Sequence, residues 1–154
     1  MDSILEKAYD AEAFRNTAHR IVDQLADFLA ENQSGKAPRV IAYRSPEEAY
    51  AYWESVAGQP QSTEDLFEAI LAQSVHLHHP HYMGHQVSPP APLAAWGSLL
   101  DGLLNNGMAV YEMGMASTAI ERAVTEKVAR QMGFGPEAGG VLTSGGTLAN
   151  LTPL

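Results

Sequence analysis

A run of small residues near the end of the sequence has the composition of an anion-binding turn. Residues 139–150, Gly-Gly-Val-Leu-Thr-Ser-Gly-Gly-Thr-Leu-Ala-Asn, are typical of a short buried strand, a glycine turn and the start of a helix. Such a turn offers free backbone N–H groups and the positive end of the helix dipole, which favour phosphate. The Thr147 hydroxyl can add a hydrogen bond. The turn lacks the lysine of a Walker A loop and the spacing of the dinucleotide fingerprint, so a plain structural turn stays a second interpretation.

Histidines are the second chemical signal, because five of the six lie within ten residues: His76, His78, His79, His81 and His85. A His-x-His pair on a strand would place two imidazoles on one face, as zinc or iron sites do. No Asp or Glu lies nearby to complete a ligand set or to orient the rings. We therefore expect no metal site here. We expect instead an uncharged polar lining of a cleft, with some histidines hydrogen-bonded in the core.

A serine hydrolase finds still less support. The sequence holds no Gly-x-Ser-x-Gly motif, and Ser144 has no assignable base.

Helices must position these residues, since apolar side chains recur at three- and four-residue spacing along most of the chain. The sequence predicts five helices, at about residues 4–32 (one helix or two abutting ones), 45–57, 62–75, 92–104 and 118–133. The helix at 92–104 is expected to be buried. The histidine segment 76–90 contains Pro80, Gly84, Pro89 and Pro90, so we expect it to be irregular.

Two helix starts show the pattern of a capping box, in which a hydroxyl and a carboxylate three residues on bond each other's backbone N–H. The first is Ser45-Pro46-Glu47-Glu48, where proline also suits the first helical position. The second pairs Thr118 with Glu121.

The composition excludes several classes of protein. The 154 residues fit one ordinary domain, and 45% of them are hydrophobic, which excludes a disordered chain. A net charge of −9 argues against a nucleic-acid partner and against an anionic membrane surface. The absence of cysteine excludes disulfides and thiolate metal sites, and it fits a cytoplasmic protein. Neither a signal peptide nor an apolar run of membrane-spanning length is visible.

Charge is almost missing from the middle of the chain. Asp101 is the one formally charged residue between Ala69 and Tyr111. This stretch is rich in Gly, Pro, His, Asn and Gln and is no membrane span. We expect it to be buried against the protein's own missing parts or another subunit.

Four motifs in order resemble the group II pyridoxal-phosphate-dependent amino-acid decarboxylases. That family includes the glutamate, aromatic amino-acid, diaminobutyrate and related histidine enzymes. The resemblance spans residues 79–151, about half of the chain, and its specificity lies in the succession of the motifs. They are His-Pro-His-Tyr-Met-Gly-His at 79–85, Asn-Asn-Gly-Met-Ala-Val-Tyr-Glu at 105–112, Thr-Ala-Ile-Glu at 118–121, and Gly-Val-Leu-Thr-Ser-Gly-Gly-Thr-Leu-Ala-Asn-Leu at 140–151.

The resemblance implies an N-terminal helical segment, residues 1–78, and the beginning of the α/β large domain of a fold-type I pyridoxal-phosphate enzyme, residues 79–154. The chain as it stands would be mostly α. In such enzymes the glycine turn holds the cofactor phosphate. The matching positions are Ser144, Gly145, Gly146 and Thr147.

The loop that begins with His-Pro lines the substrate pocket in this family, often across a dimer interface. It matches His85, Gln86 and Ser88 here, and the family varies at the first of these, so His85 bears on substrate choice. The implied partners are an amino-acid substrate and a second copy of the chain or a complementing C-terminal chain.

The sequence departs from the family because the Schiff-base lysine region, the aspartate that pairs with the pyridine nitrogen, and the stacked imidazole have no counterpart. The lysines present are Lys7, Lys36 and Lys127, none of which follows a histidine in the expected setting. Pro153 also stands where the family has a helix former. The chain alone is therefore expected to be an inactive fragment of an amino-acid carboxy-lyase. The alternative is a stand-alone helical oligomerisation module without cofactor, and a histidine–metal protein is the weakest interpretation.

Overall fold

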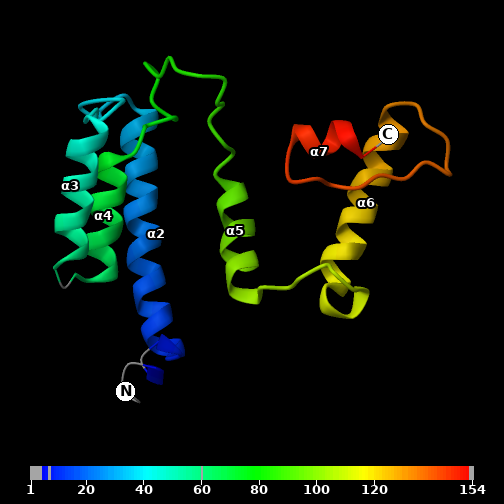
Figure 1. Ribbon diagram of the computed structural model, residues 1–154, viewed down its shortest axis with the longest axis horizontal. Coiled ribbons are helices and arrows are strands. Elements are labelled where there is room, and N and C mark those ends of the chain that lie inside the picture. The colour runs from blue at the N-terminus through cyan, green and yellow to red at the C-terminus, as the bar shows by residue number, and fades with distance from the viewer. Residues whose placement is uncertain (1–4, 7, 60, 153–154) are drawn as a thin grey trace. The chain divides into compact units, whose positions relative to one another are not determined.

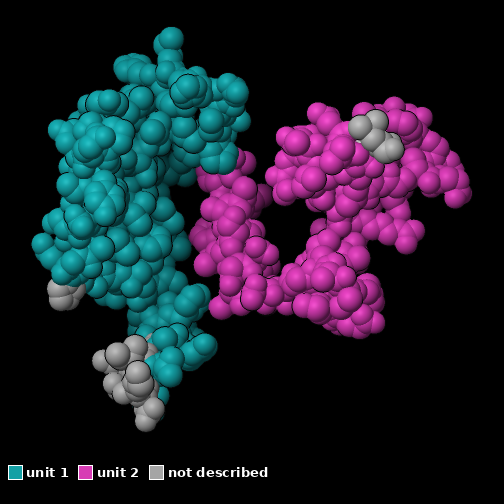
Figure 2. All heavy atoms as spheres, in the orientation of Figure 1, with its two compact units in different colours: residues 1–90 teal, residues 91–154 magenta. Residues whose placement is uncertain are grey.

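The computed structural model describes residues 5–6, 8–59 and 61–152, and all regular structure among them is helical (Figure 1). The chain separates into two compact units, Met1–Pro90 and Ala91–Leu154, which Figure 2 colours separately. The division into 1–78 and 79–154 concerns segments of the family that the sequence resembles, and it stays a prediction. No helix within the described residues has both the length and the apolar character needed to cross a membrane.

The first long helix of the first unit is α2 (Ala11–Gln33). Asp10 has extended backbone and caps the helix, because its Oδ1 accepts hydrogen bonds from the N–H groups of Glu12 and Ala13 at 2.8 and 3.0 Å. This cap separates α2 from the helical residues 5–6 and 8. The chain therefore follows the interpretation of two abutting helical segments, although residue 4 lies outside the described part.

Two further helices, α3 (Pro46–Ala57) and α4 (Thr63–Gln73), begin at the residues that the sequence indicates. Ser45 Oγ accepts from the Glu48 N–H at 3.3 Å, and Glu48 Oε2 accepts from the Ser45 N–H at 2.9 Å. This confirms the first capping box. Ser62 caps α4 by accepting from the Asp65 N–H at 3.1 Å.

The first unit is held together mainly by the packing of α2 against α4, which lie side by side in Figure 1. Arg20 of α2 pairs with Glu64 of α4, and Gln24 Nε2 donates to the backbone oxygen of Glu64 at 3.3 Å. Beyond α4 the chain returns to α2, where the His76 ring meets Phe28 edge-on at 4.9 Å. These contacts leave the face of α2 that carries Ile21 and Phe28 half-buried.

The second unit contains α5 (Leu93–Leu104), a 3₁₀ turn η1 (Tyr111–Met113), α6 (Met115–Gln131) and α7 (Gly146–Leu151). The helix predicted at 92–104 is confirmed, and its burial against missing parts of the protein or another subunit stays a prediction, because the described residues of this unit do not cover it. Leu93, Trp96 and Leu103 are 77%, 53% and 64% exposed. The unit is too small to cover them, since Gly114 and Ala129 are its only buried residues in the described part.

The second predicted capping box is also wrong, because α6 begins three residues earlier than expected. The Thr118 N–H already donates to the Gly114 carbonyl at 2.8 Å inside the helix. The Glu121 carboxylate does not cap the helix. It accepts a hydrogen bond from the Leu142 N–H at 2.7 Å, across 21 residues.

The segment before α7 forms no strand, contrary to the expectation for residues 140–143. A strand exists through a hydrogen-bonded ladder with a neighbour, and no described segment of this unit supplies one. The helix start predicted after the glycine turn is confirmed at Gly146. The departure noted at Pro153 lies outside the described residues.

Much apolar surface stays uncovered. In the second unit, apolar side chains of α5 are about half exposed, with 56% at Leu100 and 53% at Leu104. The stripe of α6 that the sequence pattern assigns to a core is part of this surface, since Ile120, Val124 and Val128 are 62%, 46% and 48% exposed.

Candidate functional site

The glycine turn leads into α7 with its helical N–H groups open to a ligand. Gly145 precedes the helix in extended backbone, and its carbonyl accepts both the Ala149 N–H at 3.0 Å and the Thr143 hydroxyl at 3.1 Å. No side chain among the described residues caps the helix. The N–H groups of the first turn of any helix lack partners within that helix. Those of Gly146 and Thr147 are therefore available to an anion.

The space around the turn also suits a ligand. A Cβ atom added to Gly145 or Gly146 would meet no described atom within 4 Å. The glycines are therefore not required by packing inside this unit.

The turn is tied to α6 at two points. One is the hydrogen bond from Leu142 N–H to the Glu121 carboxylate, and the other is Gly140, where an added Cβ would lie 3.1 Å from Thr125 Cβ. These tertiary contacts were not foreseen from the sequence, which assigned Glu121 to a helix cap.

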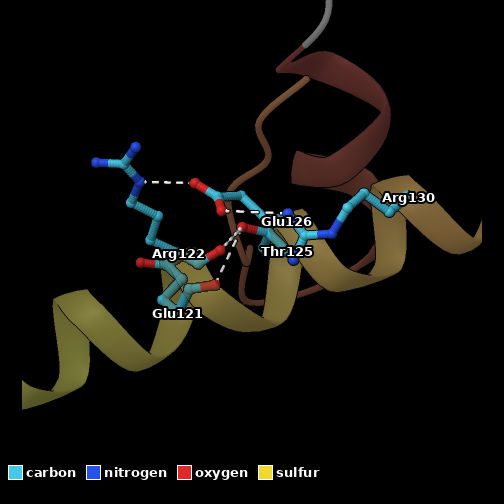
Figure 3. A network of polar contacts seen from close by, with 5 residues as sticks. All are labelled: Glu121, Arg122, Thr125, Glu126 and Arg130. Carbon is cyan, nitrogen blue, oxygen red and sulfur yellow. Dashed lines mark hydrogen bonds and ion pairs between the residues drawn. The ribbon is translucent and has the colours of Figure 1, made fainter. Parts of the chain in front are cut away.

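A ladder of charges runs along the same stretch of α6, as Figure 3 shows. Glu126 pairs with an arginine on each side. Its Oε1 lies 2.7 Å from Arg122 Nε, and its Oε2 lies 3.5 Å from Arg130 Nη1. The hydrogen bond from Arg122 lowers the pKa of Glu126 and raises the pKa of Arg122. Exposed i,i+4 pairs of this kind stabilise a helix only slightly.

The residues expected to line a substrate pocket lie in an irregular, exposed loop of the first unit. His85, Gln86 and Ser88 are all exposed, and the Val87 N–H donates to the His85 carbonyl at 2.6 Å in a tight turn. A Cβ added to Gly84, just before them, would lie 2.5 Å from the Tyr82 hydroxyl, so that ring would have to move. This loop and the phosphate turn belong to different compact units (Figure 2).

Two of the clustered histidines have structural surroundings. His76 and His79 are buried, and the His76 N–H donates to the Val40 carbonyl at 2.9 Å. His79 Nδ1 accepts the His81 N–H at 3.1 Å, which leaves its proton on Nε2. His78 Nε2 lies 3.0 Å from the Pro90 carbonyl. No group of three or more His, Asp or Glu side chains suited to a metal is found in the described ranges.

The first unit has a shallow depression of about 460 Å³ that no pattern in the sequence predicted. It lies between α2, α4 and the segment after α2. Its lining is mixed, because apolar side chains of α2 and α4 stand beside the carboxylates Asp27, Glu31 and Glu68, with Arg39 and the buried His76.

Comparison with known proteins identifies decarboxylases as relatives. The chain is 30% identical over 94 residues to an L-2,4-diaminobutyrate decarboxylase of Acinetobacter baumannii, covering 61% of this chain and 18% of that protein. It is 36% identical over 89 residues to a glutamate decarboxylase-like protein of Gibberella zeae, covering 57% and 17%. It is 31% identical over 90 residues to an L-aspartate decarboxylase of Metarhizium robertsii, covering 58% and 18%.

No protein-family model matches the chain. The chain spans about a fifth of the length of these curated relatives. The comparisons support a decarboxylase-related N-terminal region.

Proposed function

We propose that this chain is the N-terminal part of a pyridoxal-phosphate-dependent amino-acid decarboxylase, and that its glycine turn holds the cofactor phosphate. The similarity to three decarboxylases supports the class of protein. The single structural observation that carries the site is the uncapped start of α7, with open space beside Gly145 and Gly146. This is the arrangement that a phosphate group needs.

The phosphate end of the cofactor fits these residues. The N–H groups of Gly146 and Thr147 would donate to phosphate oxygens, and the hydroxyls of Ser144 and Thr147 would add hydrogen bonds. When bound, pyridoxal phosphate supplies the electron sink into which a decarboxylation releases its electron pair. The chain's own residues bind and orient the phosphate and, through the 79–88 loop, line the substrate pocket at His85, Gln86 and Ser88.

The reactive end of the cofactor is not served by these residues. Lys36 and Lys127 are exposed on the loop after α2 and on α6, and Lys7 lies outside the described residues. We therefore propose that the 154 residues bind phosphate but do not decarboxylate. The proposal also includes an amino acid as the substrate of the whole enzyme, a homodimer as its assembly and the cytoplasm as its location.

The experiment that tests the site is titration of the chain with pyridoxal 5′-phosphate, followed by amide chemical shifts. Saturable shifts confined to residues 144–148 would support the proposal. Gly146→Val should abolish them, and Gly97→Val on α5 is the control, because added Cβ atoms at both positions meet open space. Shifts that are absent, or equal in both variants, would exclude the assignment.

A second candidate function is a helical oligomerisation module that binds no cofactor. The exposed apolar side chains of α5 favour it. The same titration separates the two, because such a module would associate while the amides of residues 144–148 stayed unchanged.

A further inference from the structure

One carboxylate of α6 holds the backbone that leads into the glycine turn. Glu121 Oε1 accepts the Leu142 N–H at 2.7 Å. Leu142 lies two residues before Ser144, where the turn begins. A hydrogen bond to an ionised carboxylate is shorter and stronger than one between neutral groups.

Among the described residues, the neighbouring basic side chains pair with another carboxylate, so the Glu121 carboxylate remains available to the backbone. Arg122 and Arg130 both pair with Glu126, one turn further along α6 (Figure 3). Within the described ranges no ion pair joins Glu121 to a basic side chain. The sequence neighbours that could compete for Glu121 are thus engaged elsewhere.

A second contact fixes the same segment from the same face of the helix. Thr125 follows Glu121 by four residues, and such pairs lie on one face. Its hydroxyl donates to the carbonyls of Glu121 and Arg122 at 3.0 and 3.1 Å. With Oγ1 held in this way, Thr125 Cβ and Cγ2 lie 3.1 and 3.5 Å from the position of an added Cβ at Gly140.

We infer that Glu121 is a positioning residue for the phosphate turn: it acts through Leu142 to set the backbone of residues 144–147. The inference rests on the proposed function, because the turn matters only if it binds a phosphate. It adds that the affinity depends on a carboxylate that does not touch the ligand. The close approach of Gly140 to Thr125 accompanies this bond and places the segment against α6.

The test compares Glu121→Ala and Glu121→Gln with Glu126→Ala as the matched control. The control removes a carboxylate from the same helix without touching the loop. Circular dichroism establishes that each variant keeps its helices. Two readouts follow for each variant: hydrogen exchange at the Leu142 amide, and the Kd for pyridoxal 5′-phosphate.

In Glu121→Ala we expect Leu142 exchange to accelerate and the Kd to rise, each about tenfold. Glu121→Gln retains a carbonyl acceptor and should recover part of both, whereas Glu126→Ala should change neither. Unchanged exchange in Glu121→Ala would overturn the inference. So would faster exchange with an unchanged Kd.

The experiment distinguishes a failure of the proposed function from a failure of the inference about Glu121. Failure of the unsubstituted chain to bind pyridoxal 5′-phosphate would refute the phosphate site. The positioning role of Glu121 would then be tested by the amide chemical shifts of residues 144–147 alone. Their movement in Glu121→Ala, but not in Glu126→Ala, would support positioning, and unmoved shifts would overturn it.

Discussion

The apolar face of α5 predicts that the chain associates with itself. Its leucines and Trp96 are about half to three quarters exposed, from 48% at Leu99 to 77% at Leu93. Exposed apolar area is costly, at roughly 25 cal/mol per Å², and burial against a partner recovers that cost. We expect a homodimer or higher oligomer in which α5 is a contact, together with the exposed residues Phe14 and Leu25 of α2.

Leu100→Glu is the sharpest perturbation of that contact. Leu100 is 56% exposed, and full burial of a leucine contributes about 1.5–3 kcal/mol, so its remaining burial contributes about 1 kcal/mol. A symmetric dimer loses this twice, or about 2 kcal/mol, which weakens association about thirtyfold. The introduced carboxylate can only add to the loss. Ser98→Glu is the control, because Ser98 lies on the opposite face of the same helix.

Sedimentation velocity over a dilution series measures both variants. We expect the unsubstituted chain and Ser98→Glu to dissociate at similar concentrations, and Leu100→Glu to dissociate at concentrations about thirtyfold higher. A stable monomer of the unsubstituted chain at every concentration would refute the reasoning. It would mean that the chain tolerates its uncovered apolar surface without a partner.

Four further outcomes are expected. Gly146→Val should weaken binding of pyridoxal 5′-phosphate at least tenfold, by calorimetry, without lowering the melting temperature. When the chain is mixed with the cofactor and reduced with borohydride, peptide mapping should find no stoichiometric label on any lysine. A single stoichiometric label on one lysine, lost when an amino acid competes, would contradict this expectation. Asp10→Ala should lower stability by about 1 kcal/mol and Asp10→Asn by less, by thermal denaturation, because asparagine keeps the capping oxygen. The backbone N–H and hydroxyl of Ser45 lower the pKa of Glu48, so this stabilisation is complete above about pH 4.5 and is lost as the pH falls through the lowered pKa; Glu48→Gln, which removes the titrating group, should flatten that acid limb in circular dichroism.

Local signals in the sequence predicted the local structure. The box of Ser45 and Glu48, the cap at Ser62 and the helix start at Gly146 each depend on residues within a few positions of one another. Such pairings are decided by backbone geometry and need no distant partner. The turn of the candidate site could be found for the same reason.

Contacts between distant residues were not predictable in this way. Thr118 and Glu121 match the capping pattern, yet Glu121 bonds Leu142 because the helix already began at Met115. The described residues do not cover the 92–104 helix, so its burial stays a prediction, because composition alone does not say what covers a helix. The prediction of a strand at 140–143 was wrong, because a β ladder requires a second strand and the described residues of this unit supply none.

The bond between Glu121 and Leu142 also sets how firmly the segment between them is ordered. Residues 121–131 belong to α6, so the flexible part of this loop is residues 132–141, and closing it costs chain entropy of about 2 kcal/mol. A hydrogen bond to a charged group contributes about 1.5–3 kcal/mol, so this one bond offsets the cost of closure. Without it, the loop is expected to open locally while α6 stays folded, and a phosphate at its far end would bias it toward the closed form. Affinity at the turn would therefore include the work of ordering the loop, and shortening the loop should raise that affinity.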